Sequence, residues 1–161
     1  MKEIVNSFTV TGNILNLNTL LTSNEVIINA IDNLMITKSA NKSIWENGIL
    51  TYTITITNNS DNIITNNFSD IINPSYASLI TSLVFVDNSV PSFNYDKLTG
   101  LLEINDIIIN PNESVIISYS VSKKSNDFFV LNNTATFNNI KSNTVKVTSI
   151  LIRNCNNFAK R

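Results

Sequence analysis

Three polar residues interrupt the apolar faces of predicted β-strands, and their side chains could react with one another. They are Lys38, Asp70 and Asn143. Side chains two residues apart on a strand share a face. The apolar neighbours at this spacing are Leu34 and Ile36, Phe68 and Ile72, and Val145 and Val147. The pattern therefore predicts an amine, a carboxyl and a carboxamide in the core of one domain.

These three groups are the set that can form an isopeptide bond. An apolar site lowers the pKa of an amine and raises that of a carboxyl. The neutral Lys38 amine could then attack the side-chain carbonyl of Asn143, while a protonated Asp70 polarises that carbonyl and ammonia leaves. The alternative places the Lys38 amine in water at a strand end, with Asp70 capping the turn at Pro74 and Asn143 bonded to backbone.

The strand that organises the predicted fold covers residues 50–57. Leu50, Tyr52, Ile54 and Ile56 alternate with four threonines, which indicates a half-buried antiparallel strand. Further strands are predicted at 34–38, 63–72, 79–86, 92–95, 101–109, 115–121, 130–137 and 143–150, with one helical turn considered over 75–80. Short strands separated by polar turns predict an all-β fold, an immunoglobulin-like antiparallel β-sandwich.

Composition excludes several classes of function. The chain of 161 residues has no His, a single Cys and a net charge of -1, so neither a nucleic-acid partner nor a metal site is predicted. No catalytic signature, cofactor motif, membrane-inserted segment or recognisable signal peptide is present, and we expect no enzyme activity beyond an autocatalytic cross-link. Cys155 could form an intersubunit disulfide, or it is a free thiol.

The first residues resemble the end of a domain. Residues 23–31 and 142–150 share the pattern Ser-Asn-x-Val-x-(Ile/Val)-x-x-Ile, and roughly 120 residues separate them, close to the size of one sandwich domain. Chance similarity between two Asn-rich strands is the alternative. The predicted organisation is an extended N-terminal β arm over 1–32, a sandwich over 33–152 and a C-terminal tail over 153–161.

The arm is predicted to mediate self-assembly. A closing strand without its own sandwich could add to an exposed sheet edge of a second copy or exchange with one of its strands. Repetition of such a head-to-tail contact gives a filament. The alternative is that the arm folds back as extra strands on its own sandwich. The residues predicted to take part in assembly are Phe8, Val10, Asn24, Val26 and Ile28.

Six segments together resemble a bacterial surface repeat family called domain of unknown function eleven. In order, they are Ile36-Thr37-Lys38-Ser39, 51–58, Asp70 ahead of a proline, 111–114, Asn133-Thr134-Ala135-Thr136 and Ser142-Asn143-Thr144-Val145. The resemblance covers about 33–150, and it departs from the family at Asn112, where the family usually has Gly. It implies immunoglobulin-like sandwiches in tandem on Gram-positive cell or spore surfaces, acting as stalk, adhesin or coat modules.

The prediction from the sequence is therefore an extracellular structural subunit. We expect a self-assembling filament on a bacterial cell or spore surface, with a second copy of the chain as partner and polymerisation through N-terminal strand donation. The alternative is a monomeric adhesin or stalk module of a larger surface protein that binds a host or matrix ligand.

Overall fold

The computed structural model divides the chain into two compact units, Met1–Asn33 and Leu34–Arg161. It describes residues 2–6, 9–14, 17–22, 26–30 and 33–150. Three predicted functional residues, Phe8, Asn24 and Cys155, therefore lie outside the described residues.

The N-terminal unit consists of two paired segments of a hairpin. Strand β1 (Lys2–Asn6) pairs antiparallel with β4 (Val26–Ala30), and β2 (Thr9–Ile14) pairs antiparallel with β3 (Leu17–Thr22). The sequence pattern predicted extended structure here but not the strand β1, nor that these strands pair with one another.

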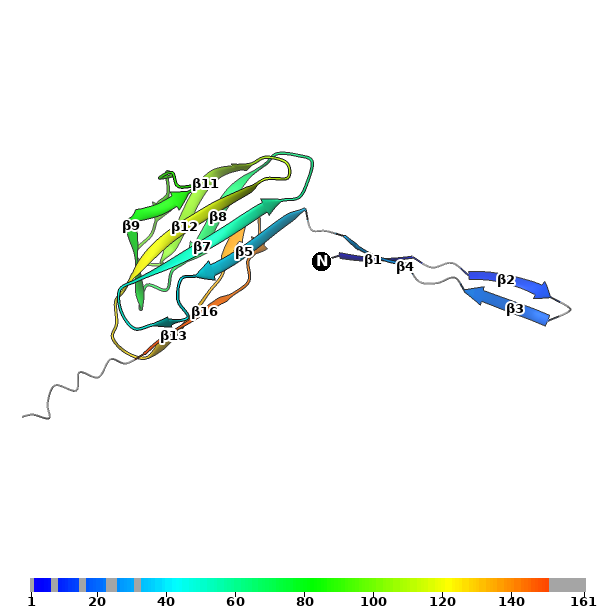
Figure 1. Ribbon diagram of the computed structural model, residues 1–161, viewed down its shortest axis with the longest axis horizontal. Coiled ribbons are helices and arrows are strands. Elements are labelled where there is room, and N and C mark those ends of the chain that lie inside the picture. Colours follow the sequence, from blue (N-terminus) through cyan, green and yellow to red (C-terminus); the bar gives the residue numbers. More distant parts are fainter. Residues whose placement is uncertain (1, 7–8, 15–16, 23–25, 31–32, 151–161) are drawn as a thin grey trace, which may run out of the picture. The chain divides into compact units, whose positions relative to one another are not determined.

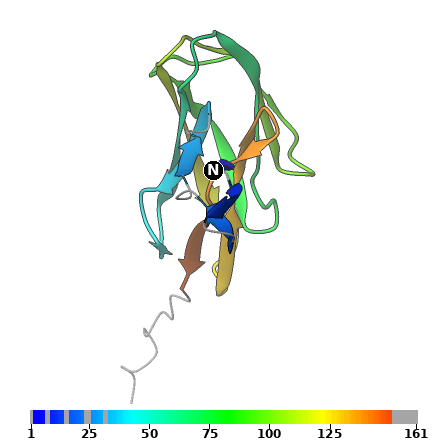
Figure 2. The ribbon, with the colours of Figure 1, turned by 90° about the vertical axis from the view of Figure 1, so that its right-hand side faces the viewer.

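The second unit is a β-sandwich, which confirms the predicted fold class. One sheet has the strand order β5-β7-β12-β9, a second has the order β10-β11-β8-β14-β15, and a third has the order β13-β16-β6. Figure 1 shows β5, β7, β12 and β9 side by side, and Figure 2 shows the strands of the sandwich in layers on either side of the core. The strand bounds are β5 (Leu34–Ala40), β6 (Ile44–Trp45), β7 (Ile49–Asn58), β8 (Ile64–Ile71), β9 (Ala77–Val86), β10 (Asn94–Tyr95), β11 (Leu101–Ile109), β12 (Ser114–Lys123), β13 (Phe129–Asn133), β14 (Ala135–Phe137), β15 (Ile140–Lys141) and β16 (Val145–Ser149).

The alternation in β7 is the reason that this strand is central. Its apolar side chains from Leu50 to Ile56 are buried while the threonines between them are partly exposed, as expected for a strand with one face on the core. In the ladder with β12, Tyr52 lies opposite Tyr119, and their ring centroids are 5.3 Å apart. The buried residues of both layers form one hydrophobic core.

The boundaries of several elements differ from the sequence-based prediction. The stretch predicted as 130–137 breaks at Thr134 into β13 and β14, and the short strands β6 and β15 were not predicted. Strand β6 pairs in parallel with β16. The possible helical turn at 75–80 is instead a turn that leads into β9.

Two turn residues have left-handed backbone conformations that explain their identity. Asn112 has a φ of 59°, a region that Asn tolerates better than most residues, so Asn can hold a turn conformation for which Gly is the usual residue. Gly100 has a φ of 75°, and a Cβ at this position would collide with the carbonyl of Ile72. Gly100 thus lets the β10–β11 turn approach the end of β8 closely.

Candidate functional site

A polar cluster lies buried between the layers of the sandwich. Lys38 comes from β5, Asp70 from β8, Tyr119 from β12 and Asn133 from the end of β13. All four residues are buried, and the side chains of Lys38 and Asp70 have no exposed surface. The sequence-based expectation that Lys38 and Asp70 face a common core is therefore confirmed.

The Tyr119 hydroxyl connects the members of this cluster. The Lys38 Nζ forms an ion pair with Asp70 Oδ2 and donates a hydrogen bond of 3.0 Å to the Tyr119 hydroxyl. That hydroxyl lies 2.7 Å from Asp70 Oδ2 and 3.3 Å from Asn133 Oδ1. The phenol oxygen is therefore within hydrogen-bonding distance of the amine, the carboxyl and the carboxamide.

Burial moves the pKa values of the amine and the carboxyl toward their neutral forms. Desolvation lowers the pKa of Lys38, and the neighbouring Asp70 only partly offsets this effect. Desolvation likewise raises the pKa of Asp70, against the opposing charge and hydrogen bond of Lys38 and the hydrogen bond of Tyr119. Buried charges are costly even when they are paired. Both shifts bring the two pKa values closer together, so proton transfer from the amine to the carboxylate costs less free energy here than it would in water.

The carboxamide of Asn133 has a fixed orientation. Its Nδ2 donates a hydrogen bond of 2.9 Å to the backbone carbonyl of Ile71, while its Oδ1 points toward the Tyr119 hydroxyl. The amide lies close enough to Asp70 to lower the pKa of that carboxyl. It does not form a hydrogen bond with Asp70 Oδ1, which has no partner among the described residues.

Two tyrosine rings form the wall around the amine. The Lys38 Nζ lies 4.7 Å from the ring centroid of Tyr52 and 5.3 Å from that of Tyr119, distances at which an ammonium is attracted to the ring face. Burial and the charge of Asp70 raise the pKa of the Tyr119 hydroxyl well above its ordinary value. Tyr119 therefore remains a proton donor across the physiological range.

Asn143 does not occupy the position that strand parity predicted. It precedes β16, is exposed, and bonds to the peptide group of Lys38 instead of facing the core with Val147. The Lys38 N–H donates to Asn143 Oδ1 at 2.8 Å, and Asn143 Nδ2 donates to the Lys38 carbonyl at 2.9 Å. Asn143 does not follow the side-chain alternation of the strand because the regular strand begins two residues later, at Val145.

Asn133 and Tyr119 are the members of the cluster that were not singled out as site residues. Asn133 is two residues from the buried Leu131 and so shares its face. Tyr119 lies two residues from the apolar Ile117 in the predicted strand 115–121, but apolar alternation alone indicates no role for its hydroxyl. The signal for Asn133 was therefore present in the alternation of β13, although it was interrupted by the break at Thr134.

The N-terminal hairpin has the same register as the end of the sandwich. In the sandwich, Asn133 pairs with Val145, and in the hairpin, Asn6 pairs with Val26. The Ser-Asn-x-Val pattern independently matches Val26 to Val145. Farther along, Val10 pairs with Leu21 as Phe137 pairs with Ile140. Of the predicted assembly residues, Val10 lies in β2, and Val26 and Ile28 lie in β4.

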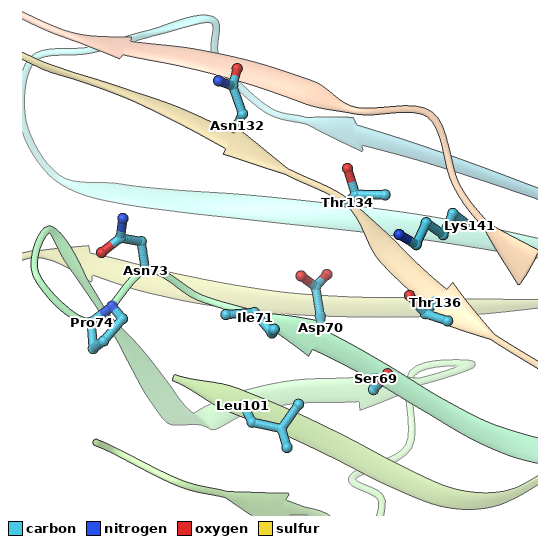
Figure 3. A pocket seen from close by; sticks show the side chains of 10 residues that line it. All are labelled: Ser69, Asp70, Ile71, Asn73, Pro74, Leu101, Asn132, Thr134, Thr136 and Lys141. Carbon is cyan, nitrogen blue, oxygen red and sulfur yellow. The ribbon is translucent and has the colours of Figure 1, made fainter. Parts of the chain in front are cut away.

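A polar groove is the second candidate site. It has a volume of about 590 Å³, and Figure 3 shows side chains from β8, β11 and the β13–β14 segment around it. Five of its ten lining residues carry a hydroxyl or an amide group, and the amine of Lys141 lies at one side. The lining residues are Ser69, Asp70, Ile71, Asn73, Pro74, Leu101, Asn132, Thr134, Thr136 and Lys141.

The described parts of the chain contain neither a cluster of candidate metal ligands nor a membrane-spanning helix. Within those residues, no group of three or more His, Cys, Asp or Glu side chains could hold a metal ion. The same residues include no helix long and apolar enough to cross a membrane.

Comparisons with known proteins support the fold. No family model matches the chain, and no curated protein matches it. Among solved structures, it is similar to the C-terminal domain of the Streptococcus pyogenes antigen I/II-family protein AspA, with a TM-score of 0.54, 15% identity and coverage of 92% of this chain and 55% of that chain. It is also similar to the C-terminal domain of the Streptococcus agalactiae antigen I/II polypeptide BspA, with a TM-score of 0.51, 14% identity and coverage of 90% and 58%. The chain thus spans little more than half of either structure, and it shares their β-sandwich fold.

Proposed function

We propose that this protein is a structural subunit of a bacterial surface filament, and that it polymerises by donating its N-terminal hairpin to a neighbouring copy. The observation that carries this proposal is the shared register of the hairpin and the closing strands of the sandwich. The likeness to domains of streptococcal antigen I/II proteins is consistent with a surface module. We further propose that the filament lies on a cell or spore surface.

The strands of the hairpin have edges that are not paired with another strand among the described residues. In the sandwich, β14 also pairs with β8, and β16 also pairs with β6. Within the described residues of the N-terminal unit, the corresponding strands β2 and β4 pair only with β3 and β1. Unpaired edges bind other strands readily because their backbone N–H and C=O groups lack partners. The hairpin therefore has the geometry of a donor.

Strand β9 is the longest edge strand that the described part of the sandwich offers. It is ten residues long, lies at the end of its sheet and pairs only with β12 among the described strands. The opposite edge of that sheet is β5, where the backbone N–H and carbonyl of Lys38 are already hydrogen-bonded to the Asn143 side chain. Strands β10 and β15, at the edges of the second sheet, are only two residues long. We therefore assign β9 as the receiving edge.

Negative-stain microscopy and sedimentation velocity of the purified full chain test this proposal. We expect filaments or a concentration-dependent series of oligomers. A chain that begins at residue 34 is the matched comparison, and it should sediment as a monomer with the β-rich circular dichroism of the full chain. A full-length protein that stays monomeric at high concentration would refute the proposal, as would a truncated one that still polymerises.

The groove supports a second candidate function, an adhesin or stalk module that binds an extracellular ligand. Its hydroxyl and amide groups can form many hydrogen bonds to an extended peptide or a carbohydrate. Binding of the full chain to immobilised glycans and extracellular-matrix proteins tests this function. A real site would lose affinity when Thr136 or Lys141 is replaced by Ala, whereas Thr65→Ala on the exposed face of β8 would have no effect.

A further inference from the structure

We infer that the sandwich cross-links itself through an isopeptide bond between Lys38 Nζ and the side-chain carbonyl carbon of Asn133, with Asp70 as the proton-transfer group. The bond joins β5, the first strand of the sandwich, to β13. It forms within one chain and does not depend on how the chain assembles. Asn133, rather than Asn143, is the acyl donor.

The arrangement of the cluster brings the reacting groups together. The Lys38 amine and the Asn133 carbonyl oxygen contact the same Tyr119 hydroxyl, at 3.0 and 3.3 Å. Complete burial of the Lys38 side chain protects the amine from water. The tyrosine rings and the strand backbones hold these groups in place, so little freedom remains to be lost in reaching the reactive geometry.

The orientation of the Asn133 carboxamide suits nucleophilic attack. The oxygen on which negative charge develops lies 3.3 Å from the Tyr119 hydroxyl, which in turn contacts the Asp70 carboxyl. Both of these groups are proton donors when neutral. Donors aimed at a developing oxyanion lower the barrier to acyl transfer. The nitrogen that must leave donates a hydrogen bond to the carbonyl of Ile71.

The proposed step is balanced without a cofactor. A proton passes from the Lys38 ammonium to the Asp70 carboxylate, which leaves a neutral amine and a neutral acid. The amine attacks Asn133 Cγ, and the protonated carboxyl stabilises the tetrahedral intermediate. Asp70 then takes the second proton from the attacking nitrogen and transfers a proton to the leaving amide nitrogen. One C–N bond forms, one breaks, and one ammonia molecule is released.

Asp70 is suited to this shuttle because of its position and its unused oxygen. Its Oδ2 contacts both the amine and the Tyr119 hydroxyl, and its Oδ1 has no hydrogen-bond partner among the described residues. A purely structural ion pair at this depth would be expected to satisfy both oxygens. An unsatisfied carboxyl oxygen beside a carboxamide instead leaves one site free to exchange a proton.

Intact mass spectrometry of the denatured full-length protein tests the bond. We expect the chain to be lighter than its calculated mass by one ammonia, and peptide mapping to recover a branched peptide that joins Lys38 to Asn133. The full calculated mass would overturn the inference. Loss of one water would also overturn it, because that loss indicates an amide between Lys38 and Asp70.

Variants separate this bond from other sources of ammonia loss. Lys38→Met, Asn133→Ala and Asp70→Asn should each restore the full mass, while Asn132→Ala on the exposed face of β13 and Asn143→Ala should keep the loss. Cyclisation at Asn47–Gly48 would also release ammonia, but it would survive Asn133→Ala. These masses are read on denatured protein, and the wild-type branched peptide decides the question even if a variant folds poorly.

Discussion

The side chain of Asn143 bonds to both backbone polar groups of Lys38, accepting from its N–H at 2.8 Å and donating to its carbonyl at 2.9 Å. A side-chain amide thus replaces the strand that would otherwise continue the sheet beyond β5. This pair fixes the backbone from which the Lys38 side chain enters the core, and it closes the edge of β5 at that point.

Replacement of Asn143 by Ala should destabilise the sandwich without removing the cross-link. Two hydrogen bonds are lost, but Asn143 is exposed, so water can partly replace them. We expect the free energy of unfolding to fall by about 1–2 kcal/mol, measured by guanidinium denaturation. Asn132→Ala is the control, with an expected change below about 0.5 kcal/mol. Equal effects of the two substitutions would mean that the Asn143 contact contributes nothing specific.

Replacement of Asn133 by Ala should have a much larger effect, because it removes a covalent link. A cross-link between positions 38 and 133 restricts the unfolded chain, and the chain-entropy model for a loop of this length gives about 4–5 kcal/mol at 25 °C. Lys38→Met should cost a similar amount. The double variant should be far from additive, since either substitution removes the same bond. If the losses of unfolding free energy in the two single variants add up in the double variant, that result would argue against the link.

The Lys38→Met variant should become more stable as the pH falls. Without the amine, Asp70 loses the opposing charge that partly holds its pKa down, and burial then raises this pKa farther above the ordinary value of 3.8. The folded state then binds a proton more tightly than the unfolded state. The resulting stabilisation is complete below the unfolded pKa and is lost as the pH rises through the folded pKa. Thermal melts between acidic and neutral pH measure this slope.

The matching control is the Lys38→Met/Asp70→Asn double variant. It has no titrating carboxyl in the cluster, so its stability should lack the part of the slope that comes from Asp70. If both proteins respond to pH in the same way, groups elsewhere in the chain account for the dependence.

Two glycines with left-handed backbones provide a test of the β10–β11 turn. At Gly100, a Cβ would strike the backbone of Ile72, whereas at Gly48 the nearest atom is the flexible end of Lys42 at 3.9 Å. Gly48→Ala should therefore cost only about 1 kcal/mol, the usual price of a left-handed conformation. Gly100→Ala should cost about 3 kcal/mol or more, because backbone strain is added. Urea denaturation of both variants, compared with the parent, checks the difference.

The sequence was most informative where alternation was long and regular. The pattern of β7 identified its buried face because Tyr52, Ile54 and Ile56 all follow it. The same alternation of side chains also predicted that Lys38 and Asp70 lie in the core. It failed at Asn143 because side-chain alternation has meaning only within a regular strand, and β16 starts after that residue.

Other features depended on contacts between distant segments. Trp45 is fully buried and packs edge-on against Phe129, with ring centroids 6.3 Å apart. The parallel pairing of β6 with β16 joins segments that no local pattern connects. The role of Asn133 could likewise not be predicted from the sequence, because it depends on how β8, β12 and β13 bring their side chains together.

The proposed acceptor edge on β9 gives the sharpest test of assembly. Thr81 is exposed on this strand, and a lysine on an edge strand disfavours the addition of another strand because its charge would be partly buried. We expect Thr81→Lys to shift sedimentation from oligomers to monomers while leaving the melting temperature nearly unchanged. Thr55→Lys places the same charge on the partly exposed face of β7, where Thr55 pairs with Ile116 on one side and with Thr37 on the other, so it should leave assembly intact. If the two variants polymerise equally well, the hairpin binds elsewhere than β9.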